Sequence, residues 1–345
     1  MESKQPTTPM AAASLVTLWI SGLLTLTTSA EMGAADPVRS RRSLLDEEPS
    51  ESRLLAKSWP KVDGHRQQFQ KFQAEAEDLF VSLKTTAANH GTRVGLVLDT
   101  WFTDAPDKVW LYTDTKDEQL ERRIGSHLVL TSCEAGHHRD ALNCKMAAEI
   151  RGFLESNAWW WCHFDDDNYV NVRALVSLLG LYDPRKDWYL GKPSTQGPIE
   201  IQQPSGEHVS FWFATGGAGF CVSHSLGLKM RPYVEDGKFE QLGRSIRLPD
   251  DVTIGYLIEH LLGQRLTVVS KFHSHLENLG LQTVETLHDQ VSLSYGKTSS
   301  GDWNVIRIDD GRFPNDYSKF RSVHCLLSPN SELCRRRQSG TELRR

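Results

Sequence analysis

The stretch "WWWCHFDDDNYV", residues 159–170, constrains the fold more than any other part of the sequence. Its first six residues carry no formal charge and four of them are aromatic. A run with so little polar interruption is typical of a central strand covered on both faces of a sheet. We therefore expect a buried strand at 159–166, with three consecutive carboxylates, Asp165, Asp166 and Asp167, where the strand ends.

Short apolar runs alternate with stretches of helical periodicity between residues 79 and 223. The sequence predicts strands at 79–86, 108–114, 127–132 and 187–193, helices at 141–156 and 170–182, a helix end or a second strand at 94–102, and a pair of strands around a glycine-rich bend at 210–223. Strands that alternate with helices form mostly parallel sheets with helices on both faces, so the expected fold class is α/β. Ligands of such sheets lie beyond the carboxyl ends of the strands, which is where the three aspartates fall.

The first 76 residues differ in character from the rest. Residues 10–30 contain no charged side chain and could span a bilayer, although they end in small residues as a cleavable signal peptide does. We favour an uncleaved type II anchor, which gives a cytosolic tail at 1–9, a signal anchor at 10–30, a stem at 31–76 and a lumenal domain at 77–345. Within the stem, "RSRR" at 39–42 is either a secretory processing site or an exposed basic turn.

Six cysteines suit the oxidising compartment that such an anchor implies. Six cysteines allow many pairings, of which loop closure favours those between near neighbours. The pairs expected on this basis, the last of them by elimination, are Cys133–Cys144, Cys325–Cys334 and Cys162–Cys221. The sequence has no C-x2-C pair, which argues against a zinc site.

The formal net charge of −5 is small for a chain of 345 residues. It provides none of the basic surface that nucleic-acid binding needs. With 39% hydrophobic residues the chain can bury a core of ordinary size. We therefore expect a globular protein without a nucleic-acid partner.

Three adjacent carboxylates repel one another unless a cation or hydrogen bonds offset their charge. A divalent cation is the simplest remedy, and carboxylates with imidazole suit Mn²⁺ or Mg²⁺ near a phosphate. The alternative is that one aspartate, with Asp167 the nearest, caps the helix expected near Val170. The aspartate run is therefore a candidate metal site or a candidate helix cap, and one residue can serve both purposes.

Further motifs offer partners for this site. In "RLPDDVTIGYLIE", Asp250 and Asp251 precede an apolar helix, so one of them either caps it or acts as a general base. In "FHSHLEN", His273 and His275 would share one face of a strand, and one of them could reach the carboxylates. The run "ATGGAGF" is either a tight bend or a place where the backbone approaches a ligand closely.

These constellations leave two enzyme interpretations open. One is transfer of a sugar from a nucleotide diphosphate donor, and the other is metal-dependent hydrolysis of a phosphate ester. A third interpretation, of a different class, is a lumenal lectin-like or secreted binding protein without catalysis.

Six motifs in the same order resemble the fringe family of β-1,3-N-acetylglucosaminyltransferases: "CHFDDDNYVN", "FWFATGGAGFC", "RLPDD" followed by "TIGY", "FHSHLE", "VSLSYG" and "FRSVHC". The resemblance runs from about Leu79 to Cys334. It implies a GT-A glycosyltransferase fold and Mn²⁺-dependent, inverting transfer of N-acetylglucosamine from UDP-GlcNAc to O-linked fucose. The implied acceptors are EGF-like repeats of Notch-type receptors, and the implied location is the Golgi membrane, with release of the domain if the stem is cut.

The resemblance also assigns roles to residues of the aspartate run. It implies that Asp165 contacts the donor nucleotide and that Asp166 and Asp167 bind Mn²⁺. The second histidine of "FHSH", His275, matches the family's additional metal ligand.

Two further roles and the disulfides follow from the same resemblance. The second aspartate of "LPDD", Asp251, matches the catalytic base, and Arg93, in a segment like the family's "KTT" and following H-x-x-R, is a candidate for donor binding. The implied disulfides agree with those favoured by loop closure.

Overall fold

The computed structural model describes residues 78–203, 206–308 and 311–338, which belong to one structural unit, Arg66–Arg345. The expected tail, anchor and stem, with the "RSRR" run, lie outside the described residues. Within the described ranges no helix has the length and apolar character needed to cross a bilayer.

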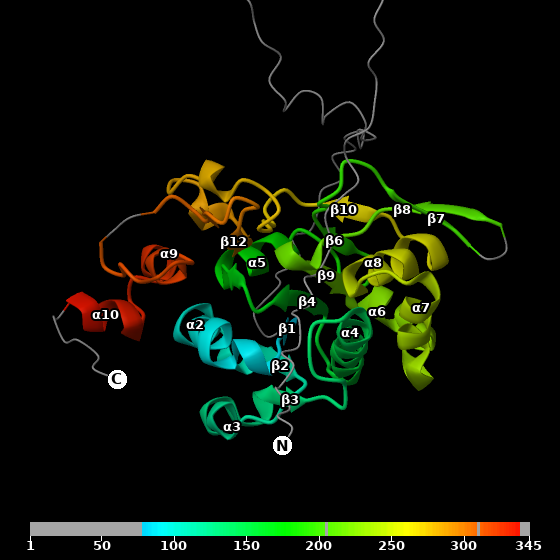
Figure 1. Ribbon diagram of the computed structural model, residues 1–345, viewed down its shortest axis with the longest axis horizontal. Coiled ribbons are helices and arrows are strands. Elements are labelled where there is room, and N and C mark those ends of the chain that lie inside the picture. Colours follow the sequence, from blue (N-terminus) through cyan, green and yellow to red (C-terminus); the bar gives the residue numbers. More distant parts are fainter. Residues whose placement is uncertain (1–77, 204–205, 309–310, 339–345) are drawn as a thin grey trace, which may run out of the picture. The chain divides into compact units, whose positions relative to one another are not determined.

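A seven-stranded sheet in the order β10-β6-β9-β4-β1-β2-β3 forms the centre of this unit (Figure 1). Neighbouring strands are parallel, except that β9 is antiparallel to both β4 and β6. The strands are β1 (Leu79–Lys84), β2 (Val109–Thr113), β3 (Leu128–Leu130), β4 (Trp160–Asp165), β6 (Tyr189–Gly191), β9 (Phe220–Ser223) and β10 (Leu266–Val268). The predicted α/β class, with a mostly parallel sheet of the kind expected for a GT-A glycosyltransferase, is confirmed.

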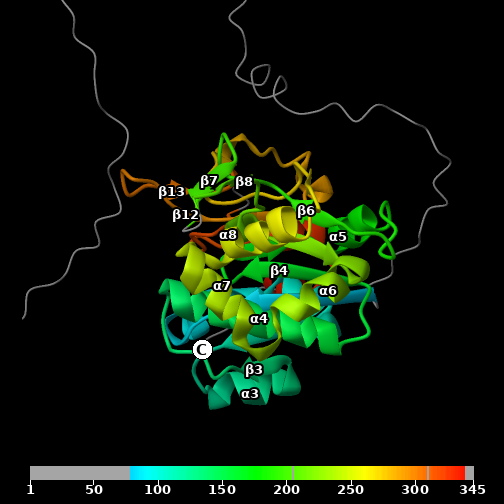
Figure 2. The ribbon, with the colours of Figure 1, turned by 90° about the vertical axis from the view of Figure 1, so that its right-hand side faces the viewer.

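Helices cover both faces of the sheet (Figures 1 and 2). One face is covered by α4 (Arg139–Glu155), α6 (His224–Met230), α7 (Lys238–Ile246) and α8 (Asp250–Gly255). The other face is covered by α2 (Gly95–Asp99), α3 (Glu118–Ile124), α5 (Val172–Leu179) and α9 (Phe320–Leu327), with α10 (Glu332–Gln338) beside α9. Figure 2, which looks onto the first face, shows α4, α6, α7 and α8 in front of the sheet.

Strand β4 is buried on both faces, as its sequence predicts. Because side chains alternate along a strand, Trp160, Cys162 and Phe164 enter the core on the α5 face, and Trp161 enters the core on the α4 face. His163, the next residue on the same face as Trp161, stacks on Phe220 of β9, with ring centroids 5.0 Å apart. The aspartate run therefore begins at the last residue of a strand that is buried on both faces.

All three expected disulfides are present: Cys133–Cys144, Cys162–Cys221 and Cys325–Cys334. Cys162 and Cys221 lie directly opposite each other on β4 and β9, with Cα atoms 4.1 Å apart. This bond joins the strand that carries the aspartates to the strand that follows the glycine-rich run.

Of the two alternatives for residues 94–102, the helix is confirmed: they form the end of a π-turn, helix α2 and the start of a 3-10 turn at Trp101–Asp104. The helix expected at 170–182 begins at Val172, because residues up to Val170 form β5 (Asn168–Val170). The side chain of Asn171 caps α5 by accepting a hydrogen bond from the Ala174 amide, so the cap is not Asp167.

The two strands expected at 210–223 belong to different sheets. β8 (His208–Phe211) pairs with β7 (Ile199–Gln202) in a hairpin, and β9 alone joins the main sheet. The glycine-rich run between them forms a 3-10 turn at Gly216–Ala218. Two other small sheets pair β5 with β11 (Ser292–Ser294) and β12 (Gly296–Lys297) with β13 (Trp303–Asn304).

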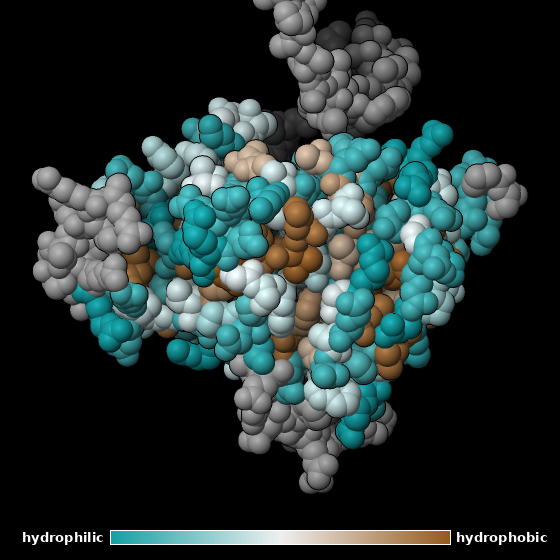
Figure 3. Space-filling model, turned by 90° about the horizontal axis from the view of Figure 1, so that it is seen from below, coloured by the Kyte–Doolittle hydropathy of each residue, from teal (hydrophilic) through white to brown (hydrophobic). Residues whose placement is uncertain are grey.

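The surface seen in Figure 3 is largely hydrophilic, with hydrophobic residues in small areas between hydrophilic ones. Scattered apolar side chains are normal on a soluble surface. This face therefore does not distinguish a binding site.

Candidate active site

The α4 face of the sheet changes from apolar to polar toward the carboxyl ends of its central strands. The side chains on this face are Phe80, Ser82 and Lys84 in β1, and Trp161, His163 and Asp165 in β4. The parallel register pairs Lys84 with Asp165. The two strands therefore end in a cation and an anion side by side.

Lys84 bridges two carboxylates. Its Nζ lies 3.2 Å from Oδ1 of Asp165 and 2.5 Å from Oδ2 of Asp250, and the side chain is only 8% exposed. Burial acts to lower the pKa of Lys84, but the two carboxylates hold it well above its usual value. Conversely, although burial acts to raise it, Lys84 and His163 hold the pKa of Asp165 well below its usual value. This bridge ties β1, β4 and the start of α8 together by charge.

A second buried ion pair lies beneath the first. The Nδ1 of His163 is 2.6 Å from Oε2 of Glu149, which also accepts a hydrogen bond from Ser82 Oγ at 2.5 Å. Burial acts to lower the pKa of His163, but the Glu149 carboxylate raises it to about 9. This pair was not predicted from the sequence, although Glu149 occupies the same apolar face of α4 as Met146 and Phe153.

Asp166 and Asp167 form the turn between β4 and β5. Asp166 accepts hydrogen bonds from Thr85 Oγ1 at 2.7 Å and Asn89 Nδ2 at 2.8 Å. Nη1 of Arg93 lies 3.0 Å from Asp166 and 3.2 Å from Asp167, so one guanidinium bridges both. Thr85 and Asn89 were not expected here; both lie in the "KTTAANHGTR" segment that contains Arg93.

One guanidinium does not offset the charge of this turn. Burial, together with the negative charges of Asp165 and Asp166, raises the pKa of Asp167 to about 7, against the opposing effect of Arg93. A carboxylate whose ionisation is so disfavoured lies where additional positive charge would be stabilising.

Asp251 lies in the first turn of α8. Pro249 is the N-cap of this helix and no side chain caps it, so the expectation that Asp250 or Asp251 does so is wrong. The carboxylate of Asp251 accepts hydrogen bonds from the amides of Gly216 at 3.0 Å and Val252 at 2.8 Å. Burial and the charge of Asp250 nevertheless raise the pKa of Asp251 to about 6. A carboxylate with that pKa can accept a proton near neutral pH.

The two histidines of "FHSH" have different surroundings. They lie in a loop after β10 and not on a strand as predicted. His273 bonds with Glu277 at 3.0 Å and Gln290 at 2.8 Å, and it does not line the pocket that lies at the carboxyl ends of β1 and β4. Burial lowers the pKa of His275, and its buried Nδ1 has no hydrogen-bond partner among the described residues. His275 is therefore a neutral imidazole with a free ring nitrogen.

The glycine-rich turn touches both of these groups. A Cβ on Gly216 would lie 3.4 Å from Cβ of Asp251, and a Cβ on Gly217 would lie 3.5 Å from Cε1 of His275. The run is a bend, as one of the two interpretations predicts, and it places the backbone beside Asp251 and His275. Its close approach to a ligand stays a prediction.

One pocket of about 490 Å³ is lined by every residue to which the family resemblance assigns a role. They are Arg93, Asp165, Asp166, Asp167, Asp251 and His275. Lys84, Thr85 and Asn89 also line it, and Tyr295 lies under Arg93 with 5.9 Å between the guanidinium and the ring. Residues distant in sequence thus meet at the carboxyl ends of β1 and β4.

The donors present fit a hard divalent cation. Asp167 lies beside two other carboxylates, and the Nδ1 of His275 has no hydrogen-bond partner among the described residues. Carboxylate and imidazole together are ligands that Mn²⁺ accepts. As the side chains stand, no three His, Cys, Asp or Glu residues in the described ranges converge on one point. Arg93, which pairs with both Asp166 and Asp167, is an alternative partner for the same carboxylates.

The fold and the pocket define an α/β protein with an acidic ligand site at the ends of its central strands. The Fringe-like family matches residues 74–331. The chain belongs to this family, and the match includes every residue of the pocket.

Curated relatives are similar over the same region. Fringe glycosyltransferase of Drosophila melanogaster is 50% identical over 265 residues, which cover 75% of this chain and 64% of that protein. Beta-1,3-N-acetylglucosaminyltransferase lunatic fringe of Danio rerio is 45% identical, covering 86% of this chain and 77% of that protein. The manic fringe enzyme of Homo sapiens is 47% identical, covering 75% and 82%.

A solved structure with some likeness to this chain is more distant in sequence. A glycosyltransferase involved in the glycosylation of the major capsid of PBCV-1 superposes with a TM-score of 0.36 at 12% identity, covering 64% of this chain and 94% of that chain. A likeness this weak carries no argument.

We expect Lys84→Met to lower the free energy of unfolding at pH 7 by about 3–5 kcal/mol, because it leaves Asp250 buried without its cation and leaves Asp165 with His163 alone. Burial without a counter-charge favours the protonated form of a carboxylate, so the cost of the substitution falls as the pH falls. The difference from the wild type should therefore shrink toward acid pH. Denaturant unfolding at neutral and mildly acidic pH measures this.

Lys229→Met is the matched control. Lys229 pairs with Asp187 at the surface and is 55% exposed. Its loss should cost no more than about 1 kcal/mol. Equal losses in the two variants would contradict the role given to Lys84.

Proposed function

We propose that this protein is an inverting glycosyltransferase that moves N-acetylglucosamine from UDP-GlcNAc in β-1,3 linkage onto O-linked fucose of EGF-like repeats, as in Notch-type receptors. The observation that carries the proposal is Asp251, a carboxylate with a raised pKa that faces the same pocket as the aspartate run. Membership of the Fringe-like family supports the reaction, because curated relatives bear the name beta-1,3-N-acetylglucosaminyltransferase.

Asp251 is the proposed general base. It would take the proton from the 3-hydroxyl of fucose as that oxygen attacks C1 of the donor sugar, with UDP leaving from the opposite face. The Gly216 and Val252 amides hold both carboxylate oxygens in place, which orients the base before the acceptor arrives. Burial supplies the raised pKa that makes proton transfer favourable near neutral pH.

The opposite side of the pocket would hold the donor diphosphate. Asp166, Asp167 and His275 are the proposed ligands of Mn²⁺, Asp165 contacts the nucleotide, and Arg93 binds the donor. When bound, Mn²⁺ would supply positive charge that offsets the charge of the leaving diphosphate. The raised pKa of Asp167 and the free ring nitrogen of His275 support this assignment.

We also propose that the domain acts in the Golgi lumen, held by a type II anchor at residues 10–30 or secreted after cleavage at 39–42. The three disulfides support an oxidising compartment.

A labelled-donor assay tests the function. We expect UDP-[³H]GlcNAc and an O-fucosylated EGF-like repeat to give labelled repeat with Mn²⁺, and background incorporation after chelation. Free labelled sugar or sugar phosphate without transfer would instead identify a phosphoesterase. Binding of the repeat without any product would identify a lectin.

Asp251→Asn tests the base. We expect kcat/KM for transfer to fall by about 10²–10⁴-fold, because the amide cannot accept the proton. UDP binding in the presence of Mn²⁺, measured by calorimetry, should be unchanged. Asp289→Asn, at a side chain 65% exposed, is the control and should keep full activity. Normal turnover by Asp251→Asn would sink the assignment.

The pH profile gives an independent test. Asp251 must be deprotonated to act, and its pKa is raised to about 6, so kcat/KM should fall as the pH drops through about 6. The residual activity of Asp251→Asn should lack this acidic limb. A wild-type rate that stays level from neutral pH down to about pH 5 would contradict Asp251 as the titrating base.

A further inference from the structure

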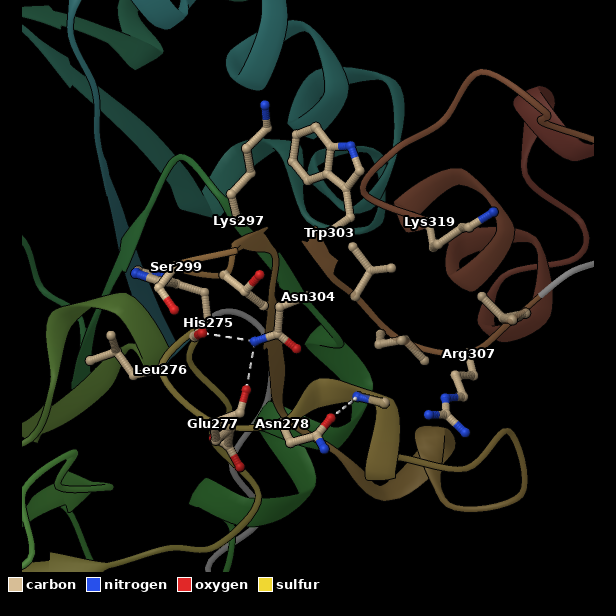
Figure 4. Close-up of a pocket in the computed structure, with 15 residues that line it drawn as sticks. His275, Leu276, Glu277, Asn278, Lys297, Ser299, Trp303, Asn304, Arg307 and Lys319 are labelled. Carbon is tan, nitrogen blue, oxygen red and sulfur yellow. Dashed lines mark hydrogen bonds between the residues drawn. The ribbon is translucent and has the colours of Figure 1, made fainter. Parts of the chain in front are cut away.

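A second cleft, of about 930 Å³, adjoins the catalytic pocket, and Figure 4 shows the residues that line this cleft. The two cavities share His275, Leu276 and Lys297. Because an acceptor sugar must reach Asp251 inside the catalytic pocket, whatever is attached to that sugar extends outside the pocket. The cleft beyond His275 is placed to contact this attached part.

The β12–β13 hairpin forms the wall between the two cavities. Nδ2 of Asn304 donates hydrogen bonds to the carbonyl oxygens of His275 at 2.8 Å and Glu277 at 2.6 Å (Figure 4). A Cβ on Gly296 would lie 2.9 Å from Cβ of His275, so glycine allows the hairpin to lie directly against the histidine. The cleft is therefore a fixed extension of the site.

Aromatic and apolar side chains are exposed at this cleft. Trp303 is 42% exposed and stacks on Tyr317, which is 63% exposed, with ring centroids 5.5 Å apart and planes inclined by 12°. Nζ of Lys297 lies 5.2 Å from the Trp303 ring, and Leu276 is 65% exposed. Tryptophan, tyrosine and arginine are the residues that contribute most to binding between proteins.

The lining of the cleft is positively charged. Lys297, Arg307 and Lys319 line it, and no described carboxylate pairs with them. Figure 4 shows Arg307 and Lys319 across the cleft from His275 and Leu276. The acid of the lining, Glu277, is bound by Lys192 at 2.7 Å and by His273. The cleft therefore attracts acidic groups.

We propose that this cleft binds the polypeptide that carries the acceptor sugar, through an acidic segment that contacts Trp303 and Arg307. The assignment rests on the proposed function. It predicts that contacts between the cleft and the polypeptide set the KM for a protein acceptor. The KM for a small fucoside, which would be held only near Asp251, should not depend on these contacts.

Trp303→Ala and Arg307→Glu test the cleft, with a folded O-fucosylated EGF-like repeat and an aryl α-fucoside as acceptors. We expect each substitution to raise the KM for the repeat about tenfold or more. The kinetics with the fucoside and the KM for UDP-GlcNAc should be unchanged. Arg307 lies outside the β12–β13 hairpin. An increase in KM for Arg307→Glu is therefore due to lost binding of the repeat and not to displacement of the hairpin.

Exposed residues away from the cleft supply the matched controls, Trp159→Ala and Arg122→Glu, at side chains 37% and 73% exposed. Both should behave as the wild type. Variants of the cleft that leave both acceptors unaffected, or that impair both equally, would overturn the assignment while the proposed function stands. A wild type that turns over neither acceptor would overturn both.

Discussion

The arrangement of the site depends on one buried cation. Lys84 ends the central strand β1 and bridges Asp165, at the end of β4, to Asp250, at the start of α8. Charges out of water are tolerated only when their partners are correctly placed, so this bridge fixes the relative position of three elements. Asp251 follows Asp250 directly, and Asp166 and Asp167 follow Asp165. The lysine therefore positions both the proposed base and the proposed metal ligands while contacting neither.

The Glu149–His163 pair extends this arrangement into the core. It lies on the same face of the sheet one step back along the strands, under α4. The site is thus the outer end of a chain of ionisable side chains that starts at Glu149, among apolar residues of the core. Acids and bases alternate along its contacts Glu149, His163, Asp165, Lys84 and Asp250. Such alternation lets each ionised group be offset by its neighbours instead of by solvent.

Sequence patterns predict the features of the structure that are set by residues close together in the chain. The run at 159–164 indicates a strand buried on both faces, the aspartates follow it, and near-neighbour cysteines pair. The Lys84 bridge could not be predicted because it depends on the register between β1 and β4 and on where α8 begins. A buried role for Glu149 could have been predicted, because it is a carboxylate on an apolar face of a helix. Its partner, His163, could not, because the contact depends on how α4 packs on the sheet. The roles of Arg93 and His275 came from the resemblance to the fringe family, and no single motif indicates that they share a pocket.

The pocket gathers residues from Lys84 to Lys297, so more than half of the chain must be folded before it exists. A donor analogue seated there binds the native state and not the unfolded one. By thermodynamic linkage it stabilises the whole domain by RT ln(1 + [L]/Kd), whichever residues it touches. Under the proposed function, the melting temperature with saturating UDP and metal would therefore report on the integrity of the entire fold.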